Sequence, residues 1–139
     1  MNLQNFEKAL EQDFVTIRHS PENKMLWNQW RGSIPSDPLR EAMIFACEFI
    51  VANEIELILA DYTKMQPPSL QDQNWIAIHS AEILQHSKLK RVANVMGTDI
   101  FQQLSIETIY QIASQTPLPC ESRDFMFKDD ALEWLFSTE

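Results

Sequence analysis

Residues 55–60, Ile-Glu-Leu-Ile-Leu-Ala, form a short apolar run in the middle of the chain. A run of this length is typical of a strand buried at the centre of a sheet. Helical signals flank it on both sides. One helix is predicted to start at Ser36-Asp37-Pro38, where a capping side chain precedes a proline in the first turn, and to end near residue 53. A strand between two helices predicts an α/β architecture.

The second helix is predicted from about residue 70 to residue 86. It follows a loop over residues 61–68, and Ser69 lies three residues before Asp72, a spacing that resembles a capping box. The expected core face of this helix is an apolar stripe made of Leu70, Ala77, Ile78, Ala81 and Leu84.

Further elements are expected on either side of this central segment. Residues 14–19 and 25–30 are separated by turn residues, and they predict a β-hairpin. Residues 1–12 predict a short helix or an irregular arm. The remaining predicted elements are a strand over 91–96, a helical turn over 99–104, a helix capped by Ser105, a strand over 125–127 and a helix over 131–136 capped by Asp130. This order predicts one domain over 1–139, with a mixed, mostly parallel sheet of four or five strands and about four helices on both faces.

The composition excludes several classes of partner. The chain has 20 acidic and 11 basic residues and a net charge of −9, which disfavours binding to nucleic acid or to an anionic membrane surface. The N-terminal residues have no signal-peptide pattern, and no apolar run is long enough to span a bilayer. With only two cysteines, Cys47 and Cys120, we expect a reducing, cytoplasmic location.

No motif for catalysis, cofactor binding or metal binding is present. The only glycines are Gly32 and Gly97, so neither a dinucleotide fingerprint nor a phosphate-binding loop is available. Paired Cys-x-x-Cys, Gly-x-Ser-x-Gly and His-Glu-x-x-His sequences are also missing. We therefore expect no cofactor, no metal and no enzymatic activity, although catalysis by residues distant in sequence stays open.

Four residues of the second predicted helix require an explanation. Trp75, Ile76 and Ile83 lie off the expected apolar stripe, and His79 lies beside Trp75. Three alternatives stay open. A neighbouring helix or the N-terminal arm covers them, they form a homodimer or partner interface, or His79 binds a metal together with Glu82 and His86.

The loop after the central strand is the second candidate site. Ligand crevices in open α/β sheets lie beyond the carboxyl ends of parallel strands, where we expect Asp61, Thr63 and Ser69. These residues predict a polar binding or phosphorylation site. Ordinary loop hydrogen bonding and helix capping is the alternative.

The whole pattern resembles the STAS-like or SpoIIAA-like proteins of bacteria. The segments that carry this resemblance are Trp30-Arg31-Gly32, Leu59-Ala60-Asp61-Tyr62, Asp72-Gln73-Asn74-Trp75-Ile76, Lys90-Arg91-Val92-Ala93, Asp99-Ile100-Phe101 and Ala131-Leu132-Glu133-Trp134-Leu135. The resemblance implies four or five strands with about four flanking helices, and it makes Ser69 the positional analogue of the phosphorylated residue of the antagonists. Their Asp-Ser-Ser-Gly motif is absent.

Two functional hypotheses follow. The preferred one is a non-enzymatic protein-interaction or regulatory module, acting as a homodimer or with another protein. The alternative is a carrier of a small apolar, lipid-like ligand, or an enzyme without a recognisable motif, that uses the crevice near Asp61. A closed apolar cavity with convergent polar groups would favour this alternative.

Overall fold

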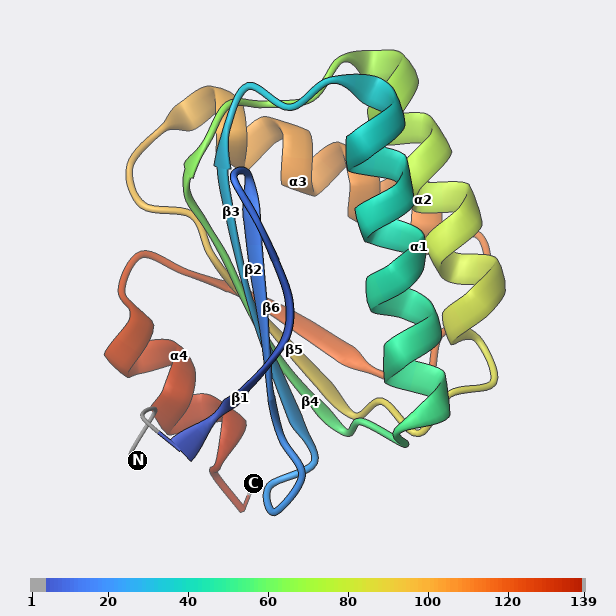
Figure 1. Ribbon diagram of the computed structural model, residues 1–139. Helices are drawn as coiled ribbons and strands as arrows, with labels where there is room; N and C mark the ends of the chain where they lie inside the picture. Colours follow the sequence, from blue (N-terminus) through green and yellow to red (C-terminus); the bar gives the residue numbers. More distant parts are fainter. Residues whose placement is uncertain (1–4, 139) are drawn as a thin grey trace.

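Six strands form one twisted sheet, with helices packed on both of its faces (Figure 1). The computed structural model describes residues 5–138. The elements in chain order are β1 (Glu7–Gln12), β2 (Val15–Ser20), β3 (Met25–Gly32), α1 (Ser36–Ala52), β4 (Leu57–Met65), α2 (Leu70–Leu84), β5 (Arg91–Val95), α3 (Ile100–Ala113), β6 (Glu121–Phe125) and α4 (Lys128–Leu135). The predicted α/β class, opening hairpin and four helices are confirmed, while the sheet has six strands and not four or five.

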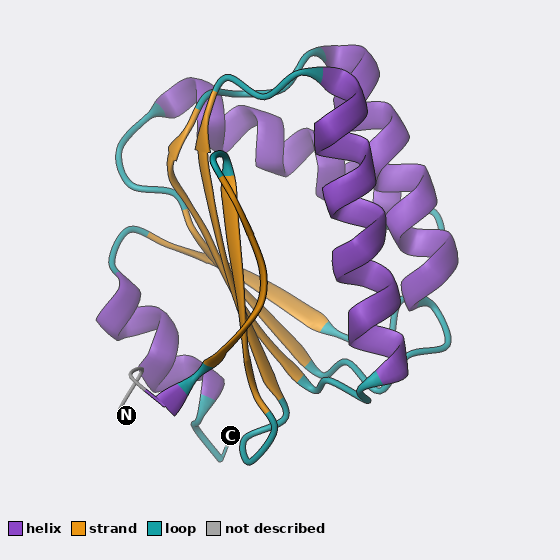
Figure 2. Cartoon of the chain, in the orientation of Figure 1, coloured by secondary structure: helices purple, strands orange, loops and turns teal. Residues whose placement is uncertain are grey.

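The strand order β1-β2-β3-β4-β5-β6 determines where the helices lie. β1, β2 and β3 pair antiparallel, whereas β3 to β6 are parallel and are joined through α1, α2 and α3. Right-handed crossovers that always advance in the same direction place all their helices on one face. These three helices accordingly form one layer, and α4 covers the opposite face (Figure 2). Helices thus cover both faces of the sheet, as predicted, with α1, α2 and α3 on one face and α4 on the other.

Both edge strands differ from the predictions. The arm expected over 1–12 contains β1, and residues 1–4 lie outside the described residues. Pairing with β2 makes this segment a strand although its side chains are mostly polar and exposed, a composition that protects a sheet edge from pairing with other chains. At the other edge, β6 ends at Phe125, where the prediction placed its start, because the polar sequence Glu-Ser-Arg-Asp hides the strand.

The boundaries of three inner elements also differ. β4 continues through the predicted loop to Met65. α3 begins at Ile100 with Asp99 as its cap, because the Asp99 carboxylate accepts hydrogen bonds from the next backbone N–H groups, so Ser105 lies inside the helix. α4 begins at Lys128 without a side-chain cap, and not at residue 131 after Asp130.

The core consists of two main clusters, one on each face of the sheet. The larger lies between the sheet and the layer of α1, α2 and α3, and it includes Leu26, Trp30, Ile50 and Ile58. The smaller lies under α4, where Ala93 and Ala131 are fully buried beside Trp134. No helix within residues 5–138 is long and apolar enough to cross a bilayer.

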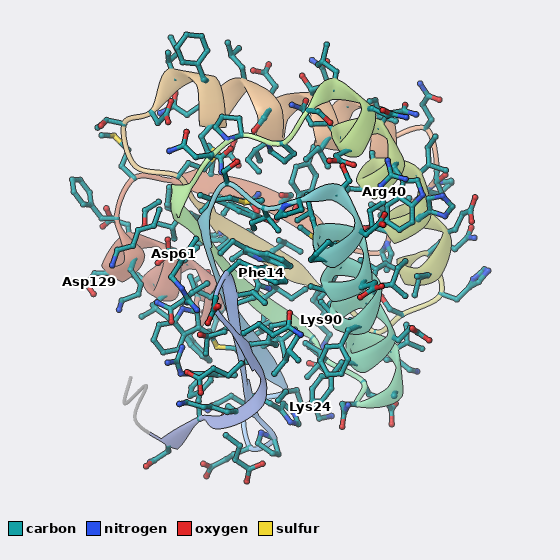
Figure 3. All side chains as sticks on the ribbon, turned by 45° about the horizontal axis from the view of Figure 1, so that its top comes forward. Phe14, Lys24, Arg40, Asp61, Lys90 and Asp129 are labelled. Carbon is teal, nitrogen blue, oxygen red and sulfur yellow. The ribbon has the colours of Figure 1, made fainter. Side chains whose placement is uncertain are left out.

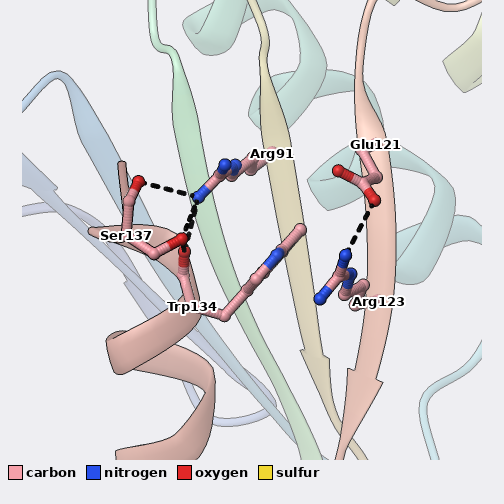
Figure 4. A network of polar contacts seen from close by, with 5 residues as sticks. All are labelled: Arg91, Glu121, Arg123, Trp134 and Ser137. Carbon is pink, nitrogen blue, oxygen red and sulfur yellow. Dashed lines mark hydrogen bonds and ion pairs between the residues drawn. The ribbon is translucent and has the colours of Figure 1, made fainter. Parts of the chain in front are cut away.

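Arg91 of β5 links the C-terminal end of α4 to the sheet by hydrogen bonds (Figure 4). Its guanidinium donates to the backbone carbonyl oxygens of Trp134 at 2.6 Å and Ser137 at 3.0 Å, and to the Ser137 hydroxyl at 2.7 Å. The same cation lies 5.2 Å from the centre of the Trp134 ring, and Arg123 lies 5.0 Å from it. A cation that satisfies the last carbonyl groups of a helix stabilises its C-terminus.

Replacing Arg91 by alanine is expected to lower the free energy of unfolding by about 2 kcal/mol, because charge-assisted hydrogen bonds to a helix end are lost. Urea unfolding measures this change. Arg123→Ala is the matched control, since it removes only an exposed ion pair with Glu121 and one ring contact. Equal losses in the two variants would contradict this role of Arg91.

Candidate functional site

The buried face of α2 differs from the predicted one. α2 packs between α1 and α3, and its buried residues are Asp72, Gln73, Ile76, Ala77 and Ala81. Ile76, predicted at an interface, is only 4% exposed and belongs to the core of this chain, so that prediction is wrong. Leu70 and Ile78, predicted in the core, are exposed. The two flanking helices, and not the sheet alone, determine which face of α2 is buried.

The other interface candidates on α2 are half-buried. The Arg40 guanidinium of α1 lies 4.9 Å from the centre of the Trp75 ring, and the His79 ring lies 4.2 Å from it on the same helix. A neighbouring helix therefore covers part of Trp75, as one alternative predicted. Ile83 is also half-buried. Within residues 5–138, no group of three or more His, Cys, Asp or Glu side chains is placed to hold a metal.

A buried carboxylate links the starts of α1 and α2. Asp72 accepts a hydrogen bond from the Ser36 hydroxyl at 2.7 Å and from Arg40 Nε at 3.0 Å, and only 5% of its side chain is exposed. Ser69 caps α2 by accepting from the Asp72 backbone N–H at 3.1 Å. Burial acts to raise the pKa of Asp72, but the hydrogen bonds and the positive charge of Arg40 hold that pKa below its usual value. This cluster joins two helices.

The structure does not bring the residues of the predicted loop site together. Asp61 and Thr63 both lie on β4, where the Asp61 carboxylate accepts from the Thr63 backbone N–H at 2.9 Å and from its hydroxyl at 2.6 Å. Asp61 lies on the side of the sheet away from Arg40 and α1 (Figure 3). Ser69 is instead the exposed cap of α2. A crevice at the strand ends requires a reversal of strand order, and this sheet has none.

An apolar cavity lies between the sheet and the layer of α1, α2 and α3. We call it the interlayer cavity, and its volume is about 120 Å³. Residues at alternate positions of β4 form its floor: Ile58, Ala60 and Tyr62. Small side chains, including Ala77 and Ala81 on α2, leave the space open. Among residues 5–138, none that lines it carries a charged side chain.

A few polar groups converge on this cavity. Tyr62 and Tyr110 both line it, and burial raises the pKa of each hydroxyl above its ordinary value. Burial also raises the pKa of the Cys47 thiol to about 11, although a hydrogen bond with Ser80 acts against this rise. All of these groups are neutral at physiological pH. The cavity therefore offers hydrogen bonds without charge.

Sequence reasoning did not find this site. Its residues come from α1, α2, α3, three strands and the loops before α2, β5 and β6, so no local motif marks it. The one available signal is the alternation in β4, where Ile58, Ala60 and Tyr62 must share a face. That signal was missed because the strand was predicted to end at residue 60.

No known family model and no curated protein matches this sequence. Among solved structures, the chain is similar to an uncharacterised protein of the DUF3478 family with a SpoIIAA-like fold from Shewanella loihica PV-4. The two share 21% identity and a TM-score of 0.60, over 97% of this chain and 98% of the other. The SpoIIAA-like fold indicated by the sequence motifs is thereby confirmed.

Proposed function

We propose that this chain is a non-enzymatic binding module that takes up a small apolar molecule in the interlayer cavity. The observation that supports this proposal is the cavity itself, about 120 Å³ in volume and lined mainly by apolar side chains. An apolar cavity of about 150 Å³ holds benzene, so this slightly smaller cavity limits a ligand to a single ring. The proposal keeps the apolar-ligand hypothesis but moves its site to the opposite face of β4 from Asp61.

The chemistry of the lining supports binding and not catalysis. A catalytic acid or base works best when its pKa is close to the working pH, and a nucleophilic cysteine requires a lowered pKa. The Cys47 thiol, with its pKa raised to about 11, stays protonated. Burial also raises the pKa of the Tyr62 and Tyr110 hydroxyls, so both stay protonated.

The same proposal places the module in the cytoplasm. Cys47 and Cys120 are free thiols, and both line the interlayer cavity. A reducing compartment keeps such thiols reduced and the cavity unchanged.

Thermal unfolding in the presence of ethylbenzene tests the proposed function. Because the ligand binds only the folded state, it adds RT ln(1 + [L]/Kd) to the free energy of unfolding, so the Tm is expected to rise with ligand concentration. An unchanged Tm up to the solubility limit of ethylbenzene would contradict the proposal.

A second candidate function is self-association, supported by an exposed apolar surface on α3 and after β6. This surface, here called the α3 patch, contains the exposed side chains Ile100, Phe101, Leu104, Met126 and Phe127. The two segments flank one hollow, which both Gln103 and Met126 line. Large exposed aromatic and aliphatic side chains are typical of protein interfaces. The proposed homodimer therefore uses the α3 patch, and not Trp75 and Ile83.

Sedimentation velocity at micromolar concentration tests this dimer. The wild type is expected to sediment as a dimer, and Phe101→Gln combined with Met126→Gln to sediment as a monomer of unchanged Tm, because both side chains are exposed. A monomeric wild type would refute self-association and would leave the ligand-binding proposal intact.

A further inference from the structure

Tyr62 is a polar group of the interlayer cavity without a partner. Its position on β4 places it beside Ala60 on the face toward the helices. No described residue exchanges a hydrogen bond with its hydroxyl, whereas its backbone carbonyl accepts from Gln102 Nε2 at 3.4 Å. The hydroxyl is therefore available to a ligand, and a bound ligand that pairs with it gains free energy.

Two other polar groups around the cavity have hydrogen-bond partners among the described residues. Asn28 Oδ1 accepts from Trp30 Nε1 at 2.8 Å. The Tyr110 hydroxyl donates to Asn94 Oδ1 at 3.4 Å. Of the two tyrosine hydroxyls, that of Tyr62 is thus the one free to bind a ligand.

The lining also determines the charge of the ligand. None of the described residues that line the cavity is charged, so a carboxylate or an ammonium group would be buried without a counter-ion. Burying an unpaired ion costs far more free energy than one hydrogen bond returns. Charged ligands are therefore excluded. A neutral ligand with a single hydroxyl or carbonyl oxygen can form one hydrogen bond with the Tyr62 hydroxyl.

We infer that the interlayer cavity selects a small neutral ring compound that carries one hydroxyl or carbonyl oxygen. This oxygen forms a hydrogen bond with the Tyr62 hydroxyl. The inference rests on the proposed function. The volume of about 120 Å³ limits the ring to about the size of benzene. Tyr62 fixes the orientation of the ligand in the cavity.

Titration calorimetry with three isosteric probes tests this inference. The probes are ethylbenzene, benzyl alcohol and benzylammonium, and the proteins are the wild type, Tyr62→Phe and the matched control Tyr110→Phe. Tyr62→Phe is expected to weaken benzyl alcohol binding roughly three- to tenfold and to leave ethylbenzene binding unchanged, because only the alcohol loses a hydrogen bond. Tyr110→Phe is expected to change benzyl alcohol binding less than twofold, since its hydroxyl is bonded to Asn94. Benzylammonium is expected to bind at least tenfold more weakly than the alcohol.

The possible outcomes separate this inference from the proposed function. If ethylbenzene does not bind the wild type, the proposed function fails and the inference fails with it. If ethylbenzene binds but Tyr62→Phe leaves benzyl alcohol binding unchanged, the inference alone fails. It also fails alone if benzylammonium binds as tightly as the alcohol. Tyr62→Phe removes an unpartnered hydroxyl, so the variant is expected to fold as stably as the wild type.

Discussion

Replacing Ala60 by leucine is expected to abolish ligand binding while the protein stays folded. Ala60 is 2% exposed and lies on the floor of the interlayer cavity, between Asn28 of β3 and Asn94 of β5 in the register of the sheet. The three added carbon atoms extend into the cavity and occupy the space of the ring. We expect affinity for ethylbenzene to fall more than a hundredfold. Filling an existing space costs less free energy than overpacking a full core.

Ala93→Leu is the matched control for this experiment. Ala93 is fully buried on the neighbouring strand β5, but it packs in the cluster under α4, where it does not line the cavity. Leucine there is expected to overpack the core and to cost about 1–3 kcal/mol, while ligand affinity stays unchanged. Urea unfolding and calorimetry measure the two quantities. If Ala60→Leu keeps the affinity, or Ala93→Leu loses it, the ligand does not occupy the interlayer cavity.

Replacing Asp72 by asparagine is expected to lower the free energy of unfolding at pH 7 by about 2–3 kcal/mol. The change removes the negative charge that accepts hydrogen bonds from Ser36 and Arg40 while keeping the size of the side chain. Arg40 is then left partly buried, beside the Trp75 ring, without its counter-ion. Glu121→Gln, which breaks an exposed ion pair with Arg123, is the control and is expected to have little effect.

The lowered pKa of Asp72 also predicts how the effect of Asp72→Asn on stability depends on pH. The pKa of Asp72 is lowered in the folded protein, so the folded state favours the ionised carboxyl more than the unfolded chain does. Its stabilisation is complete above the ordinary value of 3.8 and is lost as the pH falls below that value toward the lower folded pKa. The difference between wild type and Asp72→Asn is therefore expected to shrink between pH 4 and pH 2 in urea unfolding. A difference that is constant with pH would show that charge is not the cause.

The elements that could be predicted are those whose signals are local. The apolar run before Ala60 and the cap at Ser69 each depend on neighbours in sequence, and both are found in the structure. The polar strand β6 and the edge strand β1 are held by pairing with distant strands, so their own residues do not reveal them. Local pattern predicts an element well only where its own side chains determine its burial.

The prediction for α2 was wrong for a similar reason. Helical spacing fixes the angle between Ile76 and Ile78, but it does not say how many neighbours the helix has. Because α1 and α3 flank α2, Ile76 is buried while Ile78 is exposed. The cavity is harder still to predict, because Ala60 and Tyr110 meet only after two crossovers have folded. It depends on the distance between two layers, which no single segment encodes.

A crystal structure of the protein soaked with benzyl alcohol tests the central claim most directly. We expect density for one ring between Ala60 on the sheet and Ala77 on α2, with the ligand oxygen within hydrogen-bond distance of the Tyr62 hydroxyl. Side chains that fill this space, or a ligand bound only at the surface, would contradict the account.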